Sequence, residues 1–112
     1  MRALGAAGVL LGLATAAVAQ DAVIEATYLC ERGVEIPVVY VTGDTPVAVL
    51  LAEGRLITLP QARSASGARY AHDGEGDSYV WWNKGDTATL AYFDGQVGEE
   101  VTLFAFCEEV GD

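Results

Sequence analysis

Basic side chains, histidine and cysteine are scarce in this chain of 112 residues. Six Lys and Arg side chains stand against sixteen Asp and Glu, so the formal net charge is −10. A protein with so few cations neutralises few phosphates, which argues against nucleic acid as a partner. The only histidine is His72, so any serine nucleophile would depend on that one residue as its base.

Sequence motifs for catalysis or metal binding are also missing. No Gly-x-Ser-x-Gly sequence surrounds Ser64, Ser66 or Ser78, which argues against the nucleophile elbow of an α/β-hydrolase. Residues 73–77 carry an acid at every second position, as the first residues of an EF-hand calcium loop do. That loop needs a glycine next and an acid at its last position, where this chain has Ser78 and Lys84. We therefore interpret residues 73–77 as a solvated hairpin tip and expect no enzyme activity, no metal and no cofactor.

The N-terminal segment has the pattern of a secretory signal peptide. Arg2 precedes an apolar, small-residue stretch over residues 3–19, which ends in Ala17-Val18-Ala19. A membrane anchor is the alternative, although about 17 residues are at the short end of what spans a bilayer. We expect cleavage after Ala19, and no cysteine nearby offers a thiol for lipid attachment. Residues 20–112 would then form one soluble domain without a stable membrane anchor.

The two cysteines, Cys30 and Cys107, lie near the two ends of the exported domain. Export to an oxidising compartment favours a disulfide between them. Such a bridge would close a long loop and contribute about 4.5 kcal/mol in the chain-entropy model. That is comparable to the whole stability of a small domain. The exported domain keeps five basic and sixteen acidic side chains, a formal net charge of −11.

Turn residues recur every 8 to 12 residues between stretches rich in β-branched and aromatic residues, which predicts an all-β protein. The predicted strands are 23–31, 35–42, 47–52, 55–59, 69–72, 78–83, 87–93 and 100–107. Short Gly-containing turns join them, so all eight are expected to be antiparallel. Closure into a small barrel protects both edges, and we predict a barrel rather than a sandwich.

Alternation predicts which residues of the outermost strands face inward. In the first strand the inward set is Ile24, Ala26, Tyr28 and Cys30. In the last strand it is Val101, Leu103, Ala105 and Cys107. The disulfide would then lie on the inner side. Residues 47–52 are apolar at every position, so periodicity does not fix their inner face.

Two segments join a turn to an aromatic strand. Residues 64–70 read Ser-Ala-Ser-Gly-Ala-Arg-Tyr, where Ser66-Gly67 bends the chain and Tyr70 is expected to pack below it with its hydroxyl hydrogen-bonded. Residues 79–86 read Tyr-Val-Trp-Trp-Asn-Lys-Gly-Asp, and Lys84 is the only lysine of the chain. Taken singly, each segment is explained better as an ordinary turn.

Together, these segments resemble the membrane-bound and periplasmic inhibitors of c-type lysozyme. The likeness also includes Tyr28-Leu29-Cys30 ahead of both segments and Cys107 behind them, and it extends over nearly the whole exported domain. It implies an eight-stranded antiparallel barrel. The missing lipid-attachment cysteine points to the periplasmic branch of the family.

The resemblance also implies a partner and a site. Two loops of the family enter the lysozyme cleft, and Ser66 and Lys84 match the residues that meet the catalytic carboxylates. Trp81 or Trp82 could also touch the enzyme, and the acidic loop 73–77 could lie near the interface and weaken or redirect binding. Supporting or peripheral roles are expected for Gly67, Arg69, Tyr70, Tyr79, Trp82 and Gly85.

Two other classes of function stay open at this point. Eight strands can enclose one small molecule, as in lipocalins, although 93 residues leave little room inside. A structural or interaction protein of the cell envelope is the other alternative.

Overall fold

The computed structural model describes residues 22–74 and 76–111, so the predicted signal peptide lies outside the described residues. All eight predicted strands are present and antiparallel. They are β1 (Val23–Leu29), β2 (Glu35–Val41), β3 (Val47–Ala52), β4 (Arg55–Ala62), β5 (Ala68–Ala71), β6 (Ser78–Lys84), β7 (Thr87–Asp94) and β8 (Glu99–Glu109). One short 3-10 turn, η2 (Glu31–Gly33), follows β1. The strands pair in chain order into a closed barrel, as predicted.

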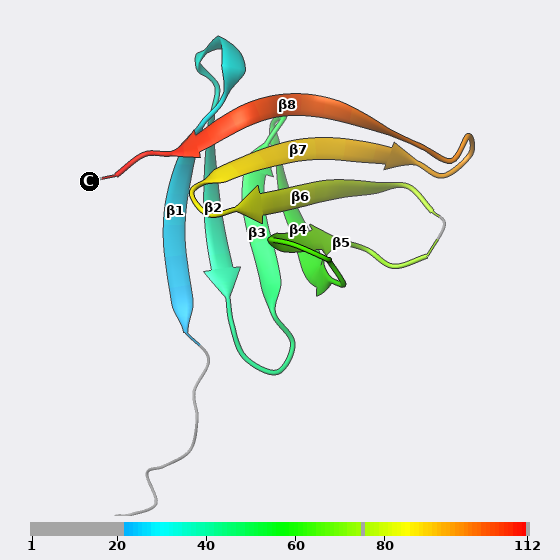
Figure 1. Ribbon diagram of the computed structural model, residues 1–112, viewed down its shortest axis with the longest axis horizontal. Coiled ribbons are helices and arrows are strands. Elements are labelled where there is room, and N and C mark those ends of the chain that lie inside the picture. The colour runs from blue at the N-terminus through cyan, green and yellow to red at the C-terminus, as the bar shows by residue number, and fades with distance from the viewer. Residues whose placement is uncertain (1–21, 75, 112) are drawn as a thin grey trace, which may run out of the picture.

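The barrel consists of two four-stranded halves that cross each other. Figure 1 shows β1–β4 running along one direction and β5–β8 lying across them. The two seams between the halves are short. At one seam β4 meets β5 only through Gln61 and Ala62, and at the other β8 meets β1 only through Glu108 and Glu109. The strands therefore diverge away from these seams.

The interior is filled with side chains around Trp81, which is fully buried. The alternation that was ambiguous over residues 47–52 is resolved by pairing, since Leu50 opposes Ile57 and Ala48 opposes Leu59. This set of residues faces inward, and Leu51 faces solvent. The predicted disulfide between Cys30 and Cys107 is confirmed, and both cysteines belong to the main core.

The prediction for the last strand is wrong in its middle. The pairing with β7 shifts by one residue twice, because Leu90 opposes Phe104 whereas Ala91 opposes Thr102 and Ala88 opposes Cys107. Phe104 is consequently buried in the core at a position where simple alternation points outward. Each bulge adds one residue to β8, so the residues that follow it exchange the inward and outward faces.

Candidate interaction site

Two loops lie together at one end of β5 and β6. Ala68, which follows the β4–β5 loop, pairs with Asn83 just before the β6–β7 hairpin. The indole Nε1–H of Trp82 donates a hydrogen bond to the carbonyl oxygen of Ser66 at 2.9 Å. The structure thus brings Ser66 and Lys84, from separate motifs, onto adjoining loops.

Gly67 is required where the two loops touch. Its φ is +67°, a left-handed conformation that favours glycine. A Cβ at this position would overlap the carbonyl oxygen of Asn83 and lie 2.7 Å from Cγ of Lys84. The predicted supporting role of Gly67 therefore has a physical basis in close packing.

Lys84 sits at the tip of a tight hairpin. It pairs with Thr87 across a two-residue loop whose first residue, Gly85, has φ +64°. The Thr87 hydroxyl donates to the Lys84 carbonyl oxygen at 3.0 Å. The Lys84 ammonium lies 4.7 Å from the centroid of the Trp82 ring, a cation–π distance, and makes no ion pair with a described carboxylate. It is exposed and available to a partner.

The backbone of Ser66 is held from two sides. Its carbonyl oxygen accepts the Trp82 indole N–H and also the hydroxyl of Ser64. The Ser66 side chain is exposed, and its own hydroxyl makes no hydrogen bond within the described part of the chain. A small donor and acceptor is thus carried on a fixed backbone beside a cation.

A hydroxyl cluster beneath the hairpin holds β6 in place, and sequence reasoning missed it. The Tyr40 hydroxyl accepts hydrogen bonds from Trp81 Nε1 and Asn83 Nδ2, each at 2.8 Å. Both nitrogens can only donate, so the Tyr40 proton is left to donate to the Tyr28 hydroxyl, 2.9 Å away. A tyrosine inside the apolar run 38–41 was the available signal, because a buried hydroxyl needs a partner.

Several expected roles are corrected by the structure. Trp81 is fully buried and offers no surface to a partner, whereas Trp82 is half-buried beside Lys84. Tyr70 is buried against the Tyr40 ring, and burial raises the pKa of its hydroxyl, but the hydrogen bond expected for that hydroxyl is not made to any described residue. Arg69, left between a supporting and a peripheral role by the sequence, forms an ion pair with Glu100 at 3.5 Å.

The acidic loop and Tyr79 lie at the far end of β6. Residues 73–77 precede Ser78, and Lys84 ends the same strand, so about 20 Å of extended chain separates them. Within this loop Asp77 accepts a hydrogen bond from the Gly95 backbone N–H at 2.7 Å, which ties it to the β7–β8 turn. The loop therefore lies at the opposite end of β6 from Lys84, and Tyr79 does not support Ser66 and Lys84 directly.

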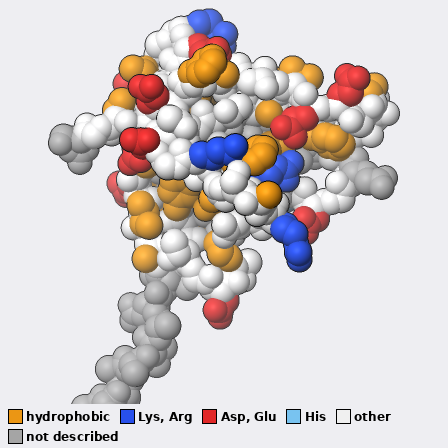
Figure 2. Space-filling view, viewed as in Figure 1, with side chains coloured by type: hydrophobic (Ala, Val, Ile, Leu, Met, Phe, Trp, Pro, Cys, Tyr) orange, Lys and Arg blue, Asp and Glu red, His pale blue; other side chains and the backbone are white. Residues whose placement is uncertain are grey.

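The positive charge of the segment from residue 20 to residue 112 is concentrated near the two loops. Of its five basic residues, Arg63, Arg69 and Lys84 belong to the two segments or the loop that leads into them. Figure 2 shows Lys and Arg side chains across the middle of the face that β5–β7 present, with hydrophobic side chains beside them. The site is a local cationic area on an acidic protein.

Within residues 22–74 and 76–111, no group of three or more His, Cys, Asp and Glu side chains is placed to hold a metal ion. The same residues contain no helix long and apolar enough to cross a membrane.

Comparison with known proteins identifies curated relatives. Residues 28–98 match the model of the family described as membrane-bound lysozyme-inhibitor of c-type lysozyme. A protein of that name from Pseudomonas aeruginosa is 39% identical over 84 residues, which are 73% of this chain and 61% of the relative. One from Cupriavidus necator is 39% identical over 64 residues, 56% and 48% of the two chains. The matched region spans less than two thirds of each of these relatives.

Solved structures share the architecture. The periplasmic lysozyme inhibitor of c-type lysozyme from Salmonella typhimurium aligns with a TM-score of 0.66 and 22% identity, over 80% of this chain and 100% of that one, which supports the fold. The Pseudomonas aeruginosa inhibitor, solved in complex with hen egg white lysozyme, aligns with a TM-score of 0.59 and 29% identity, over 98% and 100%. From its sequence and its closed eight-stranded barrel, this chain belongs to the family of membrane-bound lysozyme inhibitors of c-type lysozyme.

Proposed function

We propose that this protein inhibits c-type lysozyme by inserting Ser66 and Lys84 into the active-site cleft of the enzyme. The observation that carries the proposal is the joint presentation of these two side chains on loops braced by Trp82. Membership of the inhibitor family supports it, as does a family structure in complex with hen egg white lysozyme. The protein acts as a binding partner and not as an enzyme.

The chemistry of lysozyme explains how a lysine can inhibit. The enzyme needs one carboxyl group kept protonated as a general acid and a second one ionised. An ammonium beside the general acid favours its ionised form and so lowers its pKa. Lys84 would therefore remove the proton that bond cleavage requires. The Ser66 hydroxyl would donate to the second carboxylate, and both loops would exclude the polysaccharide.

The remaining charge of the protein assists the encounter. Lysozymes of this class are usually basic, and the exported domain has a formal net charge of −11. Opposite long-range fields raise association rates more than they raise final affinity. The cationic loops then meet the acidic centre of the cleft, while the acidic body faces the basic surface around it.

The proposed location is the periplasm. Residues 1–19 would act as a cleaved signal peptide, and the sequence offers no cysteine near Ala19 for a lipid anchor. The relatives are named as membrane-bound or periplasmic inhibitors, which fits export. The domain over residues 20–112 would then diffuse freely.

The test is lysis of a bacterial cell-wall suspension by hen lysozyme, titrated with the purified domain. We expect competitive inhibition that saturates near one inhibitor per enzyme. The Lys84→Ala variant should weaken inhibition at least about tenfold, because it removes a charge-assisted hydrogen bond, and Ser66→Ala should weaken it less.

Arg32→Ala serves as the matched control, because it removes the same charge from η2 instead of the β6–β7 hairpin. If Lys84→Ala and Arg32→Ala inhibit equally well, the contribution of Lys84 is only its share of the net charge. If the unchanged domain fails against hen lysozyme and against a panel of other c-type lysozymes, the proposed function is wrong.

A further inference from the structure

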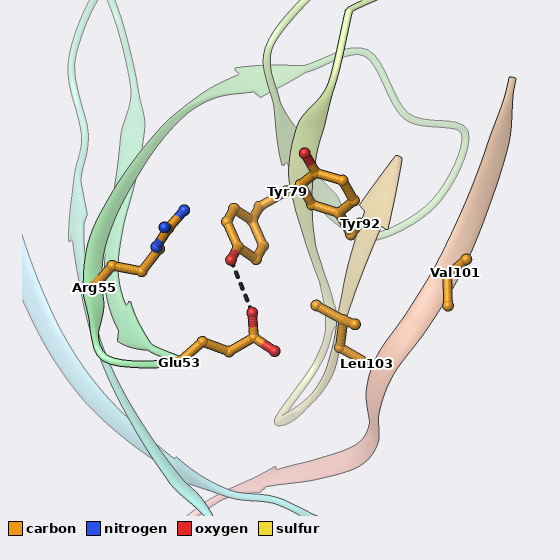
Figure 3. Close-up of a pocket in the computed structure, with 6 residues that line it drawn as sticks. All are labelled: Glu53, Arg55, Tyr79, Tyr92, Val101 and Leu103. Carbon is orange, nitrogen blue, oxygen red and sulfur yellow. Dashed lines mark hydrogen bonds between the residues drawn. The ribbon is translucent and has the colours of Figure 1, made fainter. Parts of the chain in front are cut away.

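A second candidate site lies at the open end of the barrel, away from Ser66 and Lys84. It is a cavity of about 500 Å³. Figure 3 shows Glu53 and Arg55 reaching in from one side and Val101 and Leu103 from the other, with two tyrosine rings between them. The lining residues are Glu53, Arg55, Tyr79, Tyr92, Val101 and Leu103.

The cavity exists because the two halves of the barrel diverge there. The first residues of β4 have no partner in β5, whose pairing with β4 begins at Gln61. The first residues of β8 pair only with β7, since β1 reaches β8 only at Glu108 and Glu109. Tyr79, Tyr92 and Val101 oppose one another in a single row across β6, β7 and β8. Their side chains form one wall, and the β3–β4 turn forms the other.

This wall is an apolar surface that the fold leaves uncovered. The rings of Tyr79 and Tyr92 meet edge to face, with centroids 5.1 Å apart. Val101 is 54% exposed although it belongs to the inward row. The cavity volume falls within the range of about 300 to 1,000 Å³ that is typical of small-molecule sites. An apolar group placed here would cover surface that water now covers.

The polar side chains of the cavity differ in whether they already have hydrogen-bond or ion-pair partners. The Tyr79 hydroxyl donates to Glu53 Oε1 at 2.8 Å, and this bond raises the pKa of that hydroxyl. Arg55 pairs with Ala52 across the turn that contains Glu53, and its charge acts to lower the pKa of the nearby Tyr79 hydroxyl. Its guanidinium makes no ion pair with a described carboxylate. A planar guanidinium without an ion pair, set beside an apolar wall, matches a carboxylate carried on an apolar body.

We propose that this cavity binds a small amphiphilic carboxylate, with the carboxylate on Arg55 and an aromatic or aliphatic body against Tyr79, Tyr92 and Val101. The negative charge of Glu53 repels a bound carboxylate. One oxygen of Glu53 already accepts the hydrogen bond from the Tyr79 hydroxyl. The site is independent of lysozyme inhibition, because it shares no residue with the loops that carry Ser66 and Lys84.

The test is a titration of the full exported domain with octanoate and with 1-octanol, which have the same chain length and differ in charge. Two-dimensional amide NMR reports both affinity and place. We expect octanoate to shift the amides of Tyr79, Tyr92 and Val101 and to bind at least about tenfold more tightly than octanol, since a charged partner strengthens a hydrogen bond.

Four variants make the test specific. Arg55→Gln should weaken octanoate binding about tenfold or more, and Val101→Glu, on an exposed position, should abolish it by placing a carboxylate in the cavity. Glu53→Gln should tighten it, because it removes the opposing charge. Arg63→Gln, on the exposed β4–β5 loop, should leave it unchanged.

Equal binding of octanoate and octanol, amide shifts elsewhere in the barrel, or wild-type affinity in Arg55→Gln would each overturn the proposal. The outcome is separate from that of the lysis assay. Lys84→Ala should bind octanoate as the unchanged domain does, and Arg55→Gln should still inhibit lysozyme.

Discussion

At the scale of single residues, the Tyr40 hydroxyl determines how firmly the candidate site is held. It accepts hydrogen bonds from Trp81 on the inner side of β6 and from Asn83 next to Lys84. Trp81 is completely buried, so its indole N–H has no access to water. A buried donor that loses its acceptor carries the full cost of its desolvation. The hydroxyl therefore links core packing to the position of the hairpin.

Replacing Tyr40 by Phe should lower the free energy of unfolding by about 1–3 kcal/mol, because it leaves the Trp81 donor unpaired. Urea denaturation followed by tryptophan fluorescence measures this loss. Tyr28→Phe is the matched control, since it removes only the acceptor of the Tyr40 proton and leaves the bonds to Trp81 and Asn83. Equal losses in the two variants would contradict the larger contribution assigned to the bonds from Trp81 and Asn83.

At the scale of elements, the strands and turns were predictable, and the bulges were not. Hydrophobic alternation and turn residues identified all eight strands and their pairing order. The predicted inward face of β8 was wrong between Val101 and Cys107, because two β-bulges interrupt the alternation there. The bulges depend on the pairing of β8 with β7 and cannot be recognised in the sequence of β8 alone. Phe106 has φ +56°, and nothing about an isolated Phe predicts that conformation.

The candidate site was predicted as a pair of motifs, and its internal contacts were not. The resemblance to the inhibitor family singled out Ser66 and Lys84, because composition and spacing alone favour ordinary turns at both positions. The indole bond from Trp82 to the Ser66 carbonyl and the exclusion of Trp81 from the surface depend on the strand phase of β6, which four consecutive aromatic or apolar residues leave undefined. The two donors to the Tyr40 hydroxyl, Trp81 and Asn83, lie more than 40 residues away in the chain, beyond the reach of local patterns.

The contact between the two loops leads to a prediction about Gly67. Gly67→Ala should weaken lysozyme inhibition, because its Cβ would push against Asn83 and Lys84, in addition to about 1–2 kcal/mol of strain from the left-handed backbone. The cell-wall lysis assay measures the first effect, and denaturation measures the second. Gly54→Ala is the control, because its φ is +74° with no atom near the added Cβ. Comparable inhibition by both variants would contradict a steric role for position 67.

At the scale of the whole molecule, the disulfide reinforces one of the two short seams of the barrel. Only two residue pairs join β1 to β8, and Cys30 and Cys107 connect the same two ends of the domain. The double variant Cys30→Ala/Cys107→Ala should lose about 2–5 kcal/mol of unfolding free energy. Urea denaturation under oxidising conditions measures the loss. An unchanged midpoint would show that strand pairing and core packing suffice.

The seam between β1 and β8 also has a consequence for the proposed export of the chain. β1 pairs with β2 on one side and with β8, the last strand, on the other. The cysteines that join the β1 and β8 regions are 77 residues apart in the chain. A chain that emerges from a translocation channel N-terminus first therefore cannot complete its barrel until nearly all of it has crossed. Folding rates fall as contacts become more distant in sequence. Slow closure keeps such a chain unfolded, and hence able to pass through the channel, for as long as part of it remains on the near side.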